Sequence, residues 1–397
     1  ENFFTYKLKK MEFNLFTFVF LFAILSSVLA LLWLNFRQDK AINNSYNSVP
    51  EGFSESIKLE DHQKAGNYTK AKLLLNHFEI IFSTIILLVW TIGGGMNWLD
   101  IYWSQKITNP ILMGTTFIIS ITMISSFIDL PFSIYRTFIL EHKFGFNRMT
   151  IKTFIGDFFI DIAQGLIFMV PLIYAVLYLM GLEAIRDFWW IYVWILFSFF
   201  ILTMMWIYPT FIATWKNKFK PLENEALRSR ITDLLDRTGF KSDGIYVMDG
   251  SKRSSHGNAY FTGIGKNKRI VFFDTLLKGM EDKEIEAILA HELGHFHYKH
   301  NRQRIFSSLT FFFVSFALLG YLINQVWFYN GLGISKPSSH TALILFSFAL
   351  PVFSFFITPI GNLISRKHEF QADAFAASHT DANDLISSLI KLYKENS

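Results

Sequence analysis

The amino-acid sequence predicts an α-helical membrane protein with about seven transmembrane helices and a small α+β domain inserted before the sixth helix. Of its 397 residues, 51% are hydrophobic and only 17% are charged, which is less charge than a typical soluble domain carries. Seven runs lack Asp, Glu, Lys and Arg, and each reaches the roughly 20 residues that a helix needs to cross a bilayer. The runs are 13–36, 80–99, 107–128, 162–182, 188–215, 305–335 and 337–365.

The first run follows Lys7, Lys9 and Lys10, as the apolar part of a secretory signal peptide would. It is longer than the roughly 7–15 residues of such a segment, and no small-x-small cleavage site follows it. We therefore expect a retained transmembrane helix. The runs 107–128 and 337–365 are interrupted by Thr, Ser, Gly or Pro and are the least apolar of the seven.

If the predicted spans cross the membrane in alternating directions, the loops between them form two sets on opposite sides. Lys and Arg are unevenly divided between these two sets. The loops rich in them are 37–79, 129–161, 216–304 and the C-terminal tail. The other set holds the N-terminal tail, 100–106, 183–187 and the turn around Lys336, and it carries few Lys or Arg, although the three lysines before the first run count against this division. The positive-inside rule therefore predicts that the rich set is cytoplasmic, in the endoplasmic reticulum membrane of a eukaryote or the inner membrane of a bacterium. This topology explains the net charge of +5, so we expect the lipid bilayer and no nucleic acid as a partner.

The one long polar region, 216–304, is predicted to form the α+β domain. Its segment 221–237 has an apolar stripe at helical spacing. The segments "GIYVMDG", "NAYFTGI" and "RIVFFD" read as three short strands between turn-rich stretches, and a helix begins near Glu281. We divide the chain into 1–215 with spans one to five, the insert 216–304, 305–365 with spans six and seven, and a C-terminal helix at 366–397.

A His-Glu-x-x-His motif on the last helix of the insert predicts a metal site. Positions i and i+4 lie ~40° apart on a helix, so His291 and His295 can bind one ion together. Glu292 can lie over a water molecule in the open coordination position and act as a general base. Alone, the motif does not separate a metal site from a solvated helix face. The apolar residues around it favour a buried helix.

Two further histidines follow the motif, His297 and His300. If the helix continues, they lie ~240° and ~180° around its axis from His291 and cannot face the same ion. We expect both to be interfacial polar residues at the start of the span. A continuous helix would also place His295 ~15 Å from residue 305, where the apolar run begins.

A catalytic zinc site of this type needs a third protein ligand and an open fourth position. The segment "EFQADAFA" follows the last apolar run, and its residues Glu369 and Asp373 are i and i+4 on an expected helix. Glu369 can ligate the metal, while Asp373 can orient the imidazole of a ligating histidine. Taken alone, this segment reads as a solvated helix face. Together with the His-Glu-x-x-His motif it predicts one Zn²⁺ per chain.

These motifs resemble those of the membrane-integral zinc metalloproteases of the CAAX prenyl protease type. The resemblance rests on "LAHELGHF" and "EFQADAFA", and also on "GSKRSSHGNAYFTG", "KRIVFFDTLL" and "PFSIYRTFILEHKFGFN". It extends from about residue 100 to the end of the sequence. It implies seven helices around an intramembrane chamber capped by the zinc-metalloprotease domain, with His291, His295 and Glu369 as zinc ligands and Glu292 as the base.

The resemblance further implies a substrate-binding strand in the insert. Asn258, Ala259 and Tyr260 would lie along the cleft and pair with an extended peptide, as in β-augmentation. It also implies a further C-terminal segment whose histidine assists the transition-state oxyanion. The sequence ends at Ser397, so we name no residue for that role.

The predicted function is a zinc endopeptidase that hydrolyses membrane-associated substrates, with prenylated CAAX-type proteins ranked first. The chain has no cysteine, which excludes thiolate nucleophiles and Cys-type zinc sites. One alternative is a quality-control metalloprotease without a prenyl requirement. Another is a transporter or channel with a structural zinc ion, although structural sites need no base and are closed by four ligands.

Overall fold

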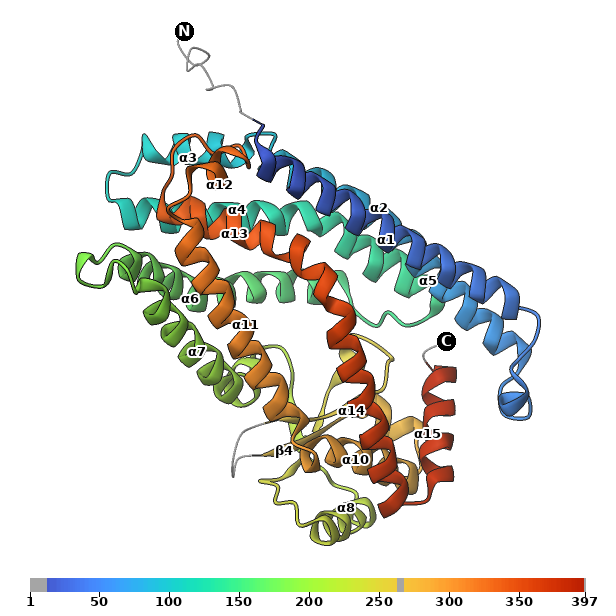
Figure 1. The fold of residues 1–397 in the computed structure, drawn as a ribbon. Helices are drawn as coiled ribbons and strands as arrows, with labels where there is room; N and C mark the ends of the chain where they lie inside the picture. Colours follow the sequence, from blue (N-terminus) through green and yellow to red (C-terminus); the bar gives the residue numbers. More distant parts are fainter. Residues whose placement is uncertain (1–12, 263–267, 396–397) are drawn as a thin grey trace.

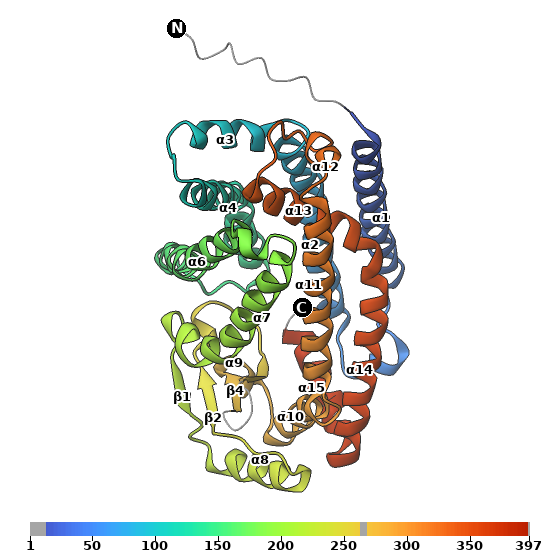
Figure 2. The same ribbon diagram turned by 60° about the vertical axis from the view of Figure 1, so that its left-hand side comes forward.

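Seven helices that are long and apolar enough to cross a membrane dominate the computed structural model, which describes residues 13–262 and 268–395 (Figures 1 and 2). Within these residues they confirm the predicted membrane fold. Five of the seven are single helices: Leu15–Ser45 (α1), Leu59–Trp90 (α2), Ile151–Met180 (α6), Trp189–Ile207 (α7) and His300–Leu322 (α11). The span Pro110–Phe144 consists of α4 (Pro110–Ile134) and the helical turns that follow it. The span Ser339–His379 consists of α13 (Ser339–Ser354) and α14 (Thr358–His379).

Shorter elements complete the fold at the two ends of the membrane helices. The helices are Gly95–Ser104 (α3), His142–Phe144 (α5), Glu225–Thr238 (α8), Asp274–Gly279 (α9), Asp282–His297 (α10), Val326–Asn330 (α12) and Ala382–Glu395 (α15). The strands are Phe219–Pro221 (β1), Ile245–Met248 (β2), Ala259–Thr262 (β3) and Arg269–Phe273 (β4).

The second apolar run, 80–99, does not form one continuous helix. α2 ends at Trp90, and Gly94 then adopts a φ angle of +77°. Glycine populates this left-handed region readily because it has no Cβ atom. The chain therefore turns, and α3 forms a separate helix across the end of the bundle that lies opposite the sheet (Figures 1 and 2).

The insert contains one small sheet with the strand order β1-β2-β4-β3. β2 and β4 are parallel, whereas β1 pairs with β2 and β3 pairs with β4 in antiparallel fashion. The three strands read from the sequence are present, and the three-residue β1 is an addition to them. β3, the strand that contains Ala259 and Tyr260, lies at one edge of the sheet, so one side of its backbone has no strand partner among the described residues.

A polar clasp ties the insert to the membrane helices. Arg253 lies between β2 and β3, and its guanidinium makes a two-point ion pair with Asp157 of α6, at 2.6 and 2.9 Å. The same group donates to the side chain of Asn217 and to the carbonyl of Lys216. The backbone N–H of Arg148 donates to the carbonyl of Arg253. Two-point guanidinium–carboxylate pairs fix geometry as well as charge, so the clasp positions the segment that leads into β3.

Asp157→Asn tests the clasp. The substitution removes the charge that the guanidinium of Arg253 pairs with, and a hydrogen bond to a charged group is worth about 1.5–3 kcal/mol. We expect the backbone amides of residues 253–262 to exchange with deuterium on the order of 10-fold faster or more, while those of α10 stay unchanged. Asp161→Asn is the control, because the Asp161 side chain that pairs with Lys216 is largely exposed. Unchanged exchange in Asp157→Asn would contradict the positioning role.

Candidate metal centre

Two helices bring the predicted metal ligands together. α10 carries His291, Glu292 and His295, and α14 carries Glu369 and Asp373. The helices touch at the glycine of the motif, where a Cβ atom on Gly294 would lie 2.8 Å from the Cα atom of Ala372. No side chain larger than hydrogen fits at that point without moving α14, so glycine sets how closely the two helices approach.

The three predicted ligands converge on one point. Single ligand atoms of His291, His295 and Glu369 all lie within 4.8 Å of one another. The carboxylate oxygen Oε2 of Glu369 is 3.5 Å from the Nε2 atom of each histidine. Ligand atoms about 2.0–2.1 Å from a tetrahedral zinc ion are about 3.3–3.4 Å apart. The donor set and its spacing therefore fit a zinc ion.

Asp373 lies where it can orient one of these histidines. Its Oδ1 atom is 2.8 Å from the Nδ1 atom of His291. If Nδ1 carries the proton and donates it to the carboxylate, the lone pair of Nε2 is directed toward Glu369. This is the arrangement that fixes the tautomer of metal-binding histidines.

His300 also contacts the site, which corrects the sequence-based expectation. α10 ends at His297, and Lys299 adopts a φ angle of +60° before α11 begins at His300. The helix is therefore not continuous, and the angle calculated for His300 is wrong. His300 is fully buried, its Nδ1 atom lies 3.0 Å from the Nδ1 atom of His295, and its Nε2 atom lies 3.0 Å from Oε1 of Gln371.

These contacts define a consistent set of proton positions. If the Nε2–H of His300 donates to the amide oxygen of Gln371, the Nδ1 lone pair of His300 is free to accept a hydrogen bond from the Nδ1–H of His295. His295 then presents the lone pair of Nε2 to the metal site. His300 thus orients His295 as Asp373 orients His291. His297 instead packs against Phe375 of α14, with ring centroids 4.9 Å apart.

Burial shifts the pKa of two groups at the site. It raises the pKa of the Glu292 carboxyl above its ordinary value, with His291 opposing this shift and Glu369 adding to it. A cation at the site would lower this pKa again, because an opposite charge favours the carboxylate. Burial lowers the pKa of the His295 imidazole, although Glu369 opposes the shift. The neutral imidazole is the form that ligates metals.

The predicted substrate segment lies beside α10, the helix that carries two of the predicted metal ligands. Phe261 of β3 packs against Phe296 of α10, with ring centroids 5.1 Å apart. The carbonyl of Asn258 accepts a hydrogen bond from the N–H of Phe273, so β3 and β4 remain in register up to that residue. The side chain of Asn258 accepts from the N–H of Ala259. These contacts attach the start of the edge strand to the sheet and the strand itself to α10.

Comparisons with known proteins cover nearly the whole chain. Residues 38–218 match the family described as "CAAX prenyl protease N-terminal, five membrane helices", and residues 221–395 match "Peptidase family M48". The chain is similar to the "CAAX prenyl protease 1 homolog" of Caenorhabditis elegans, with 32% identity over 92% of this chain and 87% of that protein. Identity to "CAAX prenyl protease 1" of Saccharomyces cerevisiae is also 32%, over 92% of this chain and 85% of the relative.

A solved structure shares the fold. The crystal structure of S. mikatae Ste24p is similar to this chain with a TM-score of 0.87 and 30% sequence identity, over 96% of this chain and 92% of that one. The similarity spans the membrane helices and the insert together.

His300→Ala tests the second imidazole contact. The change leaves Nδ1 of His295 without its partner, and loss of such an orienting contact typically lowers metal affinity about 10–100-fold. We expect a correspondingly lower metal content after dialysis of the purified protein against a graded chelator. His297→Ala is the matched control and should retain metal as the wild type does. Equal retention by both variants would restore the interfacial interpretation of His300.

Proposed function

Since this chain belongs to peptidase family M48, among the membrane-integral CAAX prenyl proteases, we propose that it is a zinc endopeptidase that cuts prenylated CAAX-type substrates. The family makes it a multi-pass membrane metalloendopeptidase. A peptidase family does not support the alternative of a transporter with structural zinc. The convergence of His291, His295 and Glu369 is the observation that carries the zinc assignment.

In this proposal the chain's own residues divide the work of hydrolysis. His291, His295 and Glu369 would hold the ion, which supplies Lewis acidity when bound. Glu292 takes a proton from the attacking water and passes it to the leaving amine nitrogen. Asp373 and His300 keep the two imidazoles in their ligating tautomers. Those contacts restrict the rings to the geometry that the reaction needs.

We further propose that β3 binds the substrate peptide in extended form. The edge of β3 that has no strand partner among the described residues offers backbone N–H and C=O groups to a peptide, and main-chain hydrogen bonds of this kind are largely independent of side-chain sequence. Asn258, Ala259 and Tyr260 would then line the peptide. Burial raises the pKa of the Tyr260 hydroxyl, so this side chain remains neutral at physiological pH.

The position of the site suits a substrate that is anchored in the membrane. α11 starts at His300, only five residues after His295, and α14 is continuous with a membrane-crossing helix. A cavity of about 590 Å³ lies between α4, α6, α7, α11 and α13, with a mostly apolar lining. Such a space can accommodate an apolar group attached to the peptide. We propose that the insert lies on the cytoplasmic side, as the distribution of Lys and Arg predicts.

Glu292→Gln separates metal binding from chemistry. Glutamine keeps the size of the side chain but cannot accept the proton of water, so turnover should fall by at least ~100-fold, the lower range for loss of general base catalysis. The zinc content of the purified variant should equal that of the wild type, as measured by elemental mass spectrometry. Peptide cleavage at near wild-type rate would show that Glu292 is not the base.

The substrate class is tested with the protein in liposomes and two CAAX peptides that differ only in the farnesyl group on cysteine. We expect kcat/KM to be at least ~10-fold higher for the farnesylated peptide, because its apolar group concentrates it at the membrane and is buried on binding. An unmodified transmembrane peptide serves as a third substrate. Equal cleavage of both CAAX peptides, or cleavage of the third substrate alone, would favour membrane-protein quality control.

A further inference from the structure

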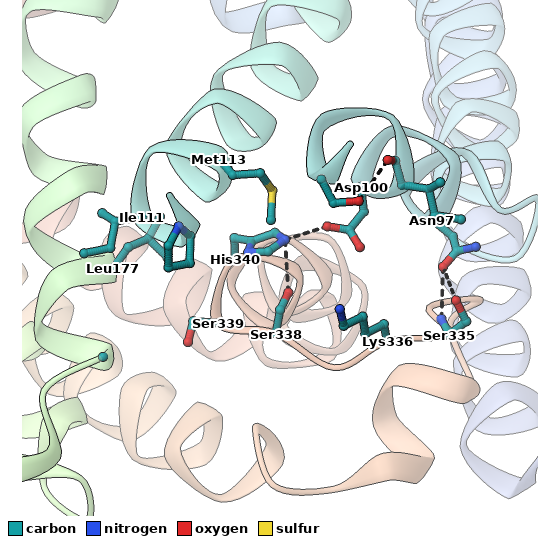
Figure 3. A pocket seen from close by; sticks show the side chains of 14 residues that line it. Asn97, Asp100, Ile111, Met113, Leu177, Ser335, Lys336, Ser338, Ser339 and His340 are labelled. Carbon is teal, nitrogen blue, oxygen red and sulfur yellow. Dashed lines mark hydrogen bonds and ion pairs between the residues drawn. The ribbon is translucent and has the colours of Figure 1, made fainter. Parts of the chain in front are cut away.

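A second pocket lies at the end of the membrane bundle opposite the metal centre. Its volume is about 680 Å³, and its walls come from α3, the start of α4, the end of α6 and the segment that enters α13 (Figure 3). None of these residues belongs to the site that carries out hydrolysis. The pocket therefore needs a separate explanation.

The helix α3 indicates the level of this pocket in the membrane. It lies across the end of the bundle in both views (Figures 1 and 2). Its Trp98 and Tyr102 are 64% and 40% exposed, whereas its Asn97 and Asp100 are buried. Exposed Trp and Tyr concentrate at the depth of the lipid headgroups. The pocket under α3 therefore lies at the headgroup level of the leaflet opposite the insert.

One wall of the pocket is a preorganised polar cluster. Asp100 Oδ1 lies 2.6 Å from Nε2 of His340, and the Ser338 hydroxyl lies 3.1 Å from the same nitrogen. A Ser-His-Asp catalytic triad uses the two different nitrogens of histidine, so this cluster is not one. Asn97 Oδ1 accepts from both the N–H and the hydroxyl of Ser335. These contacts fix the polar wall in place.

Two charges of opposite sign face the pocket. The second carboxylate oxygen of Asp100, Oδ2, accepts no hydrogen bond from the described residues. Lys336 is exposed at the mouth, its ammonium extends toward Asp100, and no carboxylate of the described residues lies within ion-pair distance of it (Figure 3). The opposite wall is apolar and includes Ile111 and Leu177. The lining is thus amphipathic and carries both signs of charge.

We propose that this pocket binds an aminophospholipid of the phosphatidylethanolamine class. The ammonium of the lipid donates to Oδ2 of Asp100, and its phosphate pairs with the ammonium of Lys336 and the hydroxyls of Ser338 and Ser339. Charge-assisted hydrogen bonds of this kind are the strong ones. The acyl chains lie along the apolar wall. The binding site is independent of the proposed protease activity.

The chemistry of the pocket discriminates among headgroups. A choline headgroup has the same net charge, but its quaternary ammonium has no N–H to donate to Asp100. A glycerol headgroup supplies the phosphate but no cation, and so leaves the carboxylate unmatched. Burying an uncompensated charge is unfavourable, so the pocket should prefer ethanolamine over both.

Titration of the purified full chain with dioctanoyl phosphatidylethanolamine, -choline and -glycerol, followed by native mass spectrometry, tests the proposal. We expect the wild type to bind the ethanolamine lipid roughly 10-fold more tightly than the other two, which corresponds to one charge-assisted hydrogen bond. Lys336→Gln should lose most of the affinity for the ethanolamine lipid, because the substitution removes the ammonium that pairs with the phosphate. Lys106→Gln is the matched control, because Lys106 is an exposed lysine in the neighbouring loop and does not line the pocket.

The variant Asp100→Asn provides a second, independent test of the proposal. An amide oxygen can still accept the hydrogen bond from His340, so the wall stays in place while the charge is removed. The variant should bind ethanolamine and choline lipids equally. If Asp100→Asn does not fold, the affinity of Lys336→Gln for the ethanolamine lipid still tests the proposal. Equal binding of all three lipids by the wild type, tighter binding of the glycerol lipid, or an unchanged affinity for the ethanolamine lipid in Lys336→Gln would each overturn the proposal.

Discussion

The close contact between α10 and α14 is the constraint on which the metal centre depends. Gly294 lies against the backbone of Ala372, and any Cβ atom there would force the two helices apart. Because His291 and Glu369 sit on opposite sides of this contact, a shift of either helix would separate them directly. Around the contact, the side chains of both helices are closely packed, and Ala290, Ala372 and Ala376 are fully buried. Small residues thus bring together groups that the sequence holds 78 positions apart (369 − 291).

The break between α10 and α11 is the second determinant of the site. Lys299 takes up a left-handed conformation that residues other than glycine rarely adopt, and such strain persists only where the surrounding structure over-determines it. The turn changes the direction of the chain immediately after the motif and leaves His300 in contact with His295. One strained residue thus links the insert to a membrane helix and supplies an orienting partner for a predicted ligand.

The sequence predicted those features that follow from local periodicity. The i and i+4 spacing of His291 with His295, and of Glu369 with Asp373, placed each pair on one helix face, and both pairs lie on helices as expected. The role of His300 was missed because it depends on a lysine at positive φ, for which no glycine or proline gives a signal. Similarly, β1 has only three residues and forms by pairing with β2, so no pattern within it indicates a strand.

The distribution of the site over several elements has a consequence for the insert. The segment 216–304 supplies His291, Glu292 and His295, but the predicted carboxylate ligand Glu369 and Asp373 come from α14, outside it. The insert alone would therefore hold two imidazoles without the negative charge that balances the ion. The clasp from Arg253 to Asp157 fixes the strand side of the insert, and α14 fixes the metal side. The insert is thus held at two separated points of the membrane bundle, and the geometry of the metal centre is a property of the whole chain rather than of its polar domain.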